Sequence, residues 1–202
     1  MLIPLLKGFG TGASLIIAIG AQNAFVLSQG VRKNHILVIP LVCAICDALL
    51  ITLGVTGLGT LIASNPRLSM AAGIGGAAFL LVYGFNAFRS ALRGGSLKAT
   101  QETTGSLKAA VIMTLAVTLL NPHVYIDTVI LLGSVASQFN LSDRGLFAAG
   151  ACIASFIWFF SLSLGSSMLA PLFEKEIAWR ILDTTVGIVM WAIAASLIVG
   201  LL

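Results

Sequence analysis

The chain has 202 residues, of which 58% are hydrophobic and only 9% are charged. With a mean hydropathy of +1.07 it has too little polar surface to cover a soluble globular fold, so a soluble enzyme or binding domain is excluded. The apolar runs are long enough for membrane helices of about 20 residues and lack the alternation of a β-barrel. We therefore expect an all-α integral membrane protein.

Six transmembrane helices are predicted in chain order, at residues 4–28, 36–63, 69–92, 108–134, 145–169 and 179–202. The longest polar stretch, residues 93–107, separates the first three helices from the last three. Residues 1–92 and 108–202 are thus predicted to be two repeats joined by a linker. Because each repeat has an odd number of helices, two repeats of the same fold would have inverted topology.

The distribution of basic residues predicts the orientation, since Lys and Arg are retained on the cytoplasmic side. Eight of the 11 basic residues flank the first, third and fifth connections: Arg32, Lys33, Arg89, Arg93, Lys98, Lys108, Lys175 and Arg180. The N-terminus and the other connections carry only Lys7, Arg67 and Arg144. We therefore expect a cytoplasmic linker and both termini outside the cytoplasm.

Several partners and activities are not supported by the sequence. The formal charge of +4 comes from basic residues spread over the connections without a cluster, which argues against nucleic-acid binding. The three cysteines lie in predicted helices and form neither a disulfide framework nor a zinc motif. Nucleotide-binding and hydrolase motifs are absent, so we expect neither an enzyme nor a cofactor.

Two of the apolar stretches contain an interruption, one in each predicted repeat. In the first helix, Gly20 precedes the amides Gln22 and Asn23, which would be unfavourable facing lipid. In the fourth, Asn121-Pro122 breaks the helix, because proline lacks the N–H and clashes with the carbonyl four residues earlier. The alternative for Pro122 is a structural kink repaired by a neighbouring helix. Matched breaks are typical of the binding site of a secondary transporter.

One carboxylate in each predicted repeat falls within the membrane. Asp47 lies near the middle of the second helix on a face of small residues, where a charge costs about 2.5 to 3.5 kcal/mol. Asp127 follows the second break, and His123 precedes it by one helical turn, so a His–Asp pair could relay protons. The alternatives are a hydrogen-bonded helix clamp for Asp47 and a packed or interfacial residue for His123.

These groups suit an amino acid with a basic side chain. Aspartate and carbonyl oxygens can bind its cationic groups, and helix N-termini can bind its carboxylate. Substrate-binding candidates are Asp47, Asp127, Asn23, Gln22 and Asn121. A divalent metal would also suit the carboxylates, but His35 is predicted in a loop and Cys43 with Cys46 lacks a second pair, so no metal site is assigned.

Aromatic and small residues suggest further contacts. Trp158 could present a cation–π face, although ordinary packing is the simpler interpretation. Trp179 is predicted to be an interfacial anchor, and Asp183 a cap or headgroup contact. The pair Gly8 and Gly12 indicates close helix packing, and such small-residue faces would permit a homodimer.

Four motifs together resemble those of the LysE-type exporters of basic amino acids. They are Gly20-Ala-Gln-Asn-Ala-Phe-Val-Leu27, Cys46-Asp47-Ala48, the Gly-Gly-Ala-Ala-Phe-Leu run that begins at Gly75, and Leu119-Leu-Asn-Pro-His-Val-Tyr-Ile-Asp127. The resemblance extends over essentially the whole chain. It implies a six-helix inner-membrane protein that exports L-arginine, with L-lysine as a further candidate, using the proton-motive force.

The resemblance also implies functional roles for Asp47, Asp127 and the Asn121-Pro122 break. We expect alternating access, in which arginine binds near both acids and protonation of Asp47 or Asp127, with His123 assisting, resets the carrier. Two alternatives remain open: a divalent-cation exporter, and a membrane scaffold whose acids only clamp helices.

Overall fold

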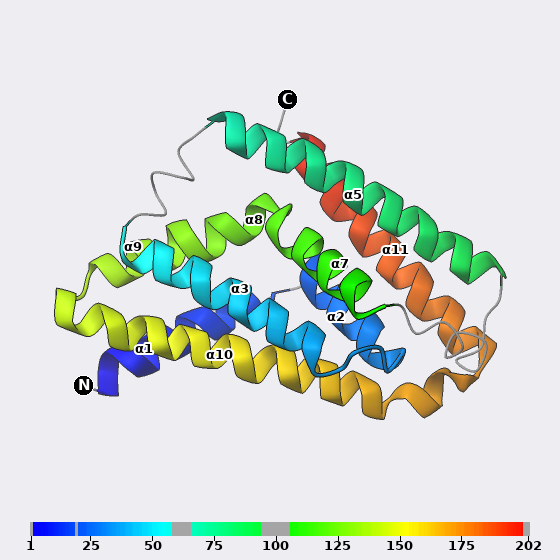
Figure 1. The fold of residues 1–202 in the computed structure, drawn as a ribbon, viewed down its shortest axis with the longest axis horizontal. Helices are drawn as coiled ribbons and strands as arrows, with labels where there is room; N and C mark the ends of the chain where they lie inside the picture. Colours follow the sequence, from blue (N-terminus) through cyan, green and yellow to red (C-terminus); the bar gives the residue numbers. More distant parts are fainter. Residues whose placement is uncertain (1, 19, 58–65, 94–105, 200–202) are drawn as a thin grey trace.

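The computed structural model describes residues 2–18, 20–57, 66–93 and 106–199. Within these ranges the chain forms helices and no strand, as predicted (Figure 1). The α-helices are α1 (Leu2–Ile16), α2 (Ala21–Val31), α3 (Val38–Val55), α5 (Pro66–Arg93), α7 (Leu107–Leu119), α8 (Pro122–Tyr125), α9 (Leu132–Ser137), α10 (Leu141–Met168) and α11 (Glu176–Val199). A π-helical turn, η1 (Ile126–Leu131), joins α8 to α9, and a 3-10 turn, η2 (Ala170–Glu174), precedes α11.

Three of the described helices, α3, α10 and α11, are long and apolar enough to cross a membrane. The number rises to five if the bent pair α1–α2 and the bent pair formed by α7 with residues 122–137 each count as one span. The predicted third span coincides with α5, which lies outside this group. The all-α membrane class is thus supported, while six spans in two repeats stay a prediction.

The predicted second span is too long at its C-terminal end. Helix α3 ends at Val55, and Gly57 follows with a φ of +80°, a left-handed conformation that terminates helices. Residues 58–63, which the prediction also included, lie outside the described residues, as does most of the predicted linker.

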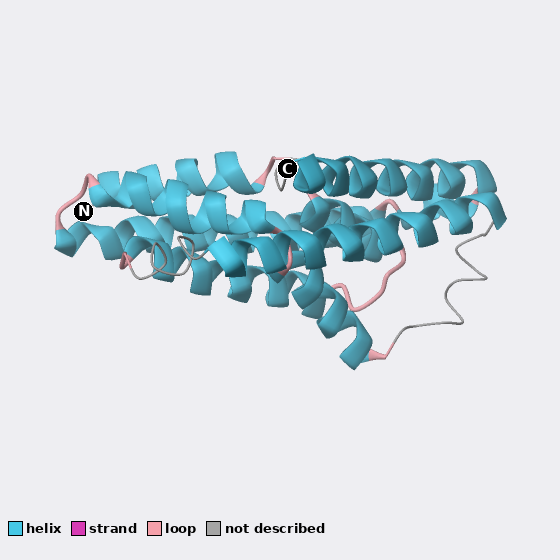
Figure 2. Ribbon diagram, turned by 90° about the horizontal axis from the view of Figure 1, so that it is seen from above, coloured by secondary structure: helices cyan, strands magenta, loops and turns pink. Residues whose placement is uncertain are grey.

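The helices lie mostly along the long axis of the molecule, and segments from the two halves of the chain pack against each other (Figures 1 and 2). Helix α1 lies beside α10, and α5 lies beside α11. Helix α3 packs on α10 and α7, while α2 packs on α10 and α11. The two broken stretches therefore meet near the middle of the molecule.

Close contact between α1 and α10 depends on glycine. A Cβ atom on Gly8 would lie 2.0 Å from the Phe147 carbonyl oxygen, and one on Gly150 would lie 2.1 Å from the Leu5 carbonyl oxygen. Gly12 similarly faces Ala151. The small-residue face of α1 is thus used within the chain, and the predicted homodimer would need another surface.

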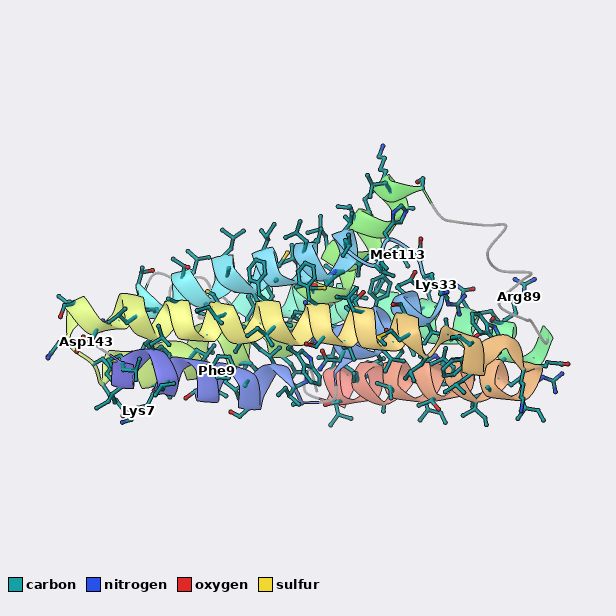
Figure 3. All side chains as sticks on the ribbon, turned by 90° about the horizontal axis from the view of Figure 1, so that it is seen from below. Lys7, Phe9, Lys33, Arg89, Met113 and Asp143 are labelled. Atoms are coloured by element: carbon teal, nitrogen blue, oxygen red, sulfur yellow. The ribbon has the colours of Figure 1, made fainter. Side chains whose placement is uncertain are left out.

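Charged residues mark the two ends of the molecule. Figure 3 shows Lys33 and Arg89 toward one end and Lys7 and Asp143 toward the other. The prediction of orientation likewise assigned Lys33 and Arg89 to one side of the membrane and Lys7 to the other. The orientation itself, with the end bearing Lys33 and Arg89 in the cytoplasm, remains a prediction.

The predictions for Trp179 and Asp183 are wrong. Both residues are buried, with exposed fractions of 1% and 0%. Neither an interfacial anchor nor a headgroup contact would be enclosed in this way. The reason is tertiary, because Arg32, the C-cap of α2, forms an ion pair with Asp183 and lies over the Trp179 ring.

Candidate functional site

The first break separates α1 from α2, and the two helices are bent by 79°. Gly20 is extended, with φ −143° and ψ 171°, and serves as the N-cap of α2. The Asn23 amide donates hydrogen bonds to the carbonyl oxygens of Ile16, at 2.8 Å, and of Ala18, at 2.7 Å. Asn23 therefore closes the end of α1 from within the first turn of α2, which satisfies carbonyls that the break leaves unpaired.

The position of Asn23 is set in turn by α10. The indole N–H of Trp158 donates to the Asn23 side-chain oxygen at 3.0 Å. Trp158 thus orients an amide, a role that differs from both the cation–π face and the simple packing considered from the sequence. Because the Asn23 side chain makes three hydrogen bonds to the protein, its main effect is to hold the break in shape.

The second break separates α7 from α8, with a bend of 64°. Asn121 is extended and its side-chain oxygen accepts from the backbone N–H of His123, while Pro122 occupies the first turn of α8. Proline suits this place because the N–H it lacks would have no partner within the helix. The Tyr125 hydroxyl donates to the Leu119 carbonyl oxygen at 2.9 Å, which closes the end of α7.

A π-helical turn follows the second break and contains Asp127. Such turns widen the backbone and are frequent at functional sites. Thr128, in the same turn, donates its hydroxyl to the Val124 carbonyl oxygen at 2.5 Å. The irregular segment thus extends from Leu120 to Leu131, beyond the break that the sequence predicts at Asn121-Pro122.

Both breaks line one cavity of about 420 Å³. Its lining includes seven of the eight residues that the sequence assigned to the site or to a helix break: Gly20, Gln22, Asn23, Asp47, Asn121, His123 and Asp127. Pro122, the eighth, is outside the lining. The C-terminal part of α11 completes the wall with Ala192, Ile193 and Ser196.

Asp47 is the more enclosed of the two acids, with an exposed fraction of 2%. The Ser155 hydroxyl of α10 donates to its Oδ2 atom at 2.8 Å. Gln22 lies beside the same carboxyl and donates from its amide to the Thr118 hydroxyl at 3.0 Å. Asp47 is therefore held by polar groups from α10 and α2, at the level of both breaks.

Asp127 is only half-buried, and His123 is exposed. The two groups are close enough to interact electrostatically, but no ion pair joins them among the described side chains. The two acids therefore differ, since one is enclosed and hydrogen-bonded and the other is accessible. A cavity with two carboxylates and, in its described lining, no lysine or arginine suits a cation.

Several contributors were not expected from the sequence. Ser155, Thr118 and Tyr125 act through contacts between distant segments, and a serine, threonine or tyrosine in an apolar helix gives no periodic signal. Tyr125 lies within the motif that begins at Leu119, so the motif offered a weak indication. For metals, no group of three or more His, Cys, Asp or Glu side chains is assembled in the part of the chain that the structure describes.

Comparison with known proteins agrees with the resemblance of the four motifs. The family described as LysE type translocator matches residues 13–201. The arginine exporter protein ArgO of Serratia proteamaculans (strain 568) is 44% identical over 198 residues, covering 98% of this chain and 97% of that protein. The protein of the same name from Escherichia coli (strain K12) is 43% identical over 192 residues, covering 95% and 91%. No solved structure matches the chain. The predicted resemblance is confirmed, and the chain belongs to the LysE family of translocators.

Proposed function

We propose that this protein is a secondary transporter of the bacterial inner membrane that exports L-arginine, with L-lysine as a further substrate. One observation carries the proposal: a single cavity brings both helix breaks together with one carboxylate from each half of the chain. Relatives that match over nearly their whole length are named as arginine exporters, which supports the choice of substrate.

The two acids are proposed to bind different parts of the substrate or to act at different steps. Asp47 is enclosed and already hydrogen-bonded by Ser155, so it is suited to a cationic group that has lost its water. Asp127 is accessible and near His123, so it is suited to exchanging protons with the cavity. Gln22 and Asn121 contribute polar groups to the wall between them.

Alternating access is supported by the pattern of contacts between the halves. Suppose that α1–α2 corresponds to α7–α9, α3 to α10, and α5 to α11. Exchanging the two halves then converts the α1–α10 contact into the α7–α3 contact, and the structure contains both contacts. The α2–α10 contact likewise corresponds to the α9–α3 contact, and α5–α11 corresponds to itself. This pseudo-symmetry is expected of inverted repeats that rock about a central site.

The energetics of export favour coupling to an entering ion, which we propose to be the proton. A membrane potential that is negative inside opposes the exit of a monocation by about 2.3 kcal/mol per 100 mV. Net export therefore needs a steep arginine gradient or an ion that enters in exchange. Asp127, Asp47 and His123 are the titratable groups of the cavity that could bind an entering proton.

The alternatives considered from the sequence have less support. A divalent-cation exporter would need more ligands than the described part of the chain gathers in one place. A scaffold whose acids merely clamp helices would not require a cavity at the acids, and membership of a translocator family also disfavours it.

Counterflow of labelled L-arginine in proteoliposomes tests the proposal. We expect labelled arginine to exchange with internal unlabelled arginine, and L-lysine to inhibit this exchange. With manganese in place of internal arginine we expect no exchange. A second preparation with an imposed pH gradient tests proton coupling separately. Manganese movement without arginine exchange would contradict the substrate, and absence of any flux would contradict transport.

A further inference from the structure

A second buried cluster lies away from the central cavity. Arg32, the C-cap of α2, places its Nη2 atom 2.6 Å from Oδ1 of Asp183 in α11. The Ser90 hydroxyl of α5 donates to the other carboxylate oxygen, Oδ2, at 2.5 Å. The Arg32 guanidinium also lies 4.7 Å from the centroid of the Trp179 ring.

This cluster has the composition of a guanidinium-binding site. A carboxylate supplies charge-assisted hydrogen bonds, and the face of an indole attracts the planar cation. Ser90 fixes the carboxylate, since it occupies the oxygen that Arg32 does not bind. The protein therefore builds, from α5 and α11, a binding site for the same chemical group that an arginine substrate carries.

Space for a second cation adjoins the cluster. A cavity of about 250 Å³ is lined by Arg32 and Asp183 together with the polar residues Ser28, Gln29 and Asn86. It shares no lining residue with the central cavity. The two cavities nevertheless lie along the same helices, α2 and α11.

The two cavities follow each other along these helices. Gln22 lines the first and Gln29 the second, and seven helical residues correspond to about 10 Å. Phe25 and Met190, which are both buried, lie between the two cavities in the sequences of α2 and α11. The second cavity is toward the end of the molecule that bears Lys33 and Arg89, which is the predicted cytoplasmic end (Figure 3).

The two partners of the ion pair differ in their access to water. The Arg32 side chain is 22% exposed, whereas the Asp183 side chain is 1% exposed. Arg32 is thus the partner that can leave, and Asp183 is the one that must be paired, because an unpaired buried carboxylate is strongly unfavourable. An incoming guanidinium that replaces Arg32 would keep Asp183 paired throughout.

We propose that Asp183, Ser90 and Trp179 form a second binding site for the cationic side chain of the transported amino acid, which Arg32 occupies in this structure. Substrate displaces Arg32 and so releases the C-terminal end of α2 from α11, while Ser90 keeps Asp183 in place. The inference rests on the proposed function, because it takes an amino acid with a guanidinium or ammonium group as the ligand.

Equilibrium binding of labelled L-arginine to the detergent-purified, full-length protein tests this site. In detergent both ends of the protein face the same solution, so the result does not depend on its orientation in a membrane. The double variant Asp47→Asn/Asp127→Asn serves as the background, since it weakens the central site. We expect this background to retain saturable binding that methylguanidinium competes for and neutral L-citrulline does not. Adding Asp183→Asn should weaken it at least tenfold, and adding Arg32→Gln should strengthen it at least fivefold.

The opposite effects of the two substitutions separate a binding site from a structural ion pair. If the ion pair is only structural, Asp183→Asn and Arg32→Gln should both weaken binding or both leave it unchanged, and either result would overturn the inference. Absence of saturable binding by the folded Asp47→Asn/Asp127→Asn variant would also overturn it. If Arg32→Gln does not give a monodisperse protein, Arg32→Lys replaces it, because lysine loses the planar stacking and should also compete less well. Arginine counterflow by the wild-type protein is measured in parallel, so that a failure of transport is distinguished from a failure of this site.

Discussion

Asn23 offers a direct test of how the first break is held. Replacing it with alanine removes the hydrogen bonds to the carbonyl oxygens of Ile16 and Ala18 and leaves the Trp158 N–H without its partner. Since the break exposes carbonyls at membrane depth, these groups must find another donor or remain unpaired. We therefore expect Asn23→Ala to destabilise the fold as well as to impair transport.

The size of the effect follows from the three bonds. Ala18 lines the central cavity, so its carbonyl oxygen can find water there and its bond contributes little. The bonds to Ile16 and from Trp158 are partly buried, and such bonds in membrane proteins are worth about 0.6 to 1.5 kcal/mol each. Asn23→Ala should thus cost about 1 to 3 kcal/mol, and Trp158→Phe, which removes one bond, roughly half as much.

Unfolding by increasing SDS in a mild detergent, followed by far-ultraviolet circular dichroism, measures these differences. Ser14→Ala is the matched control, because its hydroxyl bonds to the Thr11 carbonyl oxygen within α1 and is exposed. It should change stability by less than about 0.5 kcal/mol. If Asn23→Ala unfolded at the same SDS fraction as Ser14→Ala, the role assigned to Asn23 would be refuted.

Four further expectations concern the acids, the packing, the coupling and the orientation. Asp47→Asn and Asp127→Asn should each lower arginine counterflow by about tenfold or more, equivalent to about 1.4 kcal/mol of lost interaction, and full flux in both would contradict the site. Gly54→Val should destabilise the fold by about 1 to 3 kcal/mol, because a Cβ atom there would lie 2.6 Å from the Thr128 carbonyl oxygen. The control Gly145→Ala, where a Cβ atom would have no neighbour within 4 Å, should leave stability unchanged in the same SDS titration. A pH gradient, acidic outside, should accelerate export from proteoliposomes, and equal flux without it would exclude coupling. A reporter that is active only in the cytoplasm should be inactive when fused after Leu202, and activity would reverse the predicted orientation.

Much of the helical arrangement could be predicted because the membrane imposes simple rules. Apolar runs of about 20 residues indicated the helices, and the described ends agree within a few residues for α10 and α11. Pro122 predicted the break in the fourth helix for a covalent reason, since its ring removes a donor and clashes with the preceding turn. The end of α3 was missed because Gly57 adopts a left-handed conformation that an apolar count does not detect.

The acids of the central cavity were predictable, whereas Asp183, which pairs with Arg32, was not distinguished from a cap. Asp47 stood in the middle of a long apolar run, where only a buried polar site explains a carboxylate. Asp183 lies close to a predicted helix start, and there a cap or headgroup contact is equally compatible with the sequence. Its burial depends on Arg32, which is 151 residues away, and no local pattern connects the two.

The two breaks illustrate why the positions of helix breaks in such a protein are easier to predict than the hydrogen-bond donors that close them. Each break leaves carbonyl oxygens at the end of a helix, and hydrocarbon requires only that some donor reach them. In the first half this donor is the Asn23 amide, and in the second it is the Tyr125 hydroxyl, each acting from within the helix that follows. Because an amide and a phenol satisfy the same requirement, the halves can share a geometry without sharing the residues that close it. A comparison of the two halves by sequence therefore detects where the chain is interrupted, and the contacts that make the interruption stable appear only once the helices are placed in space.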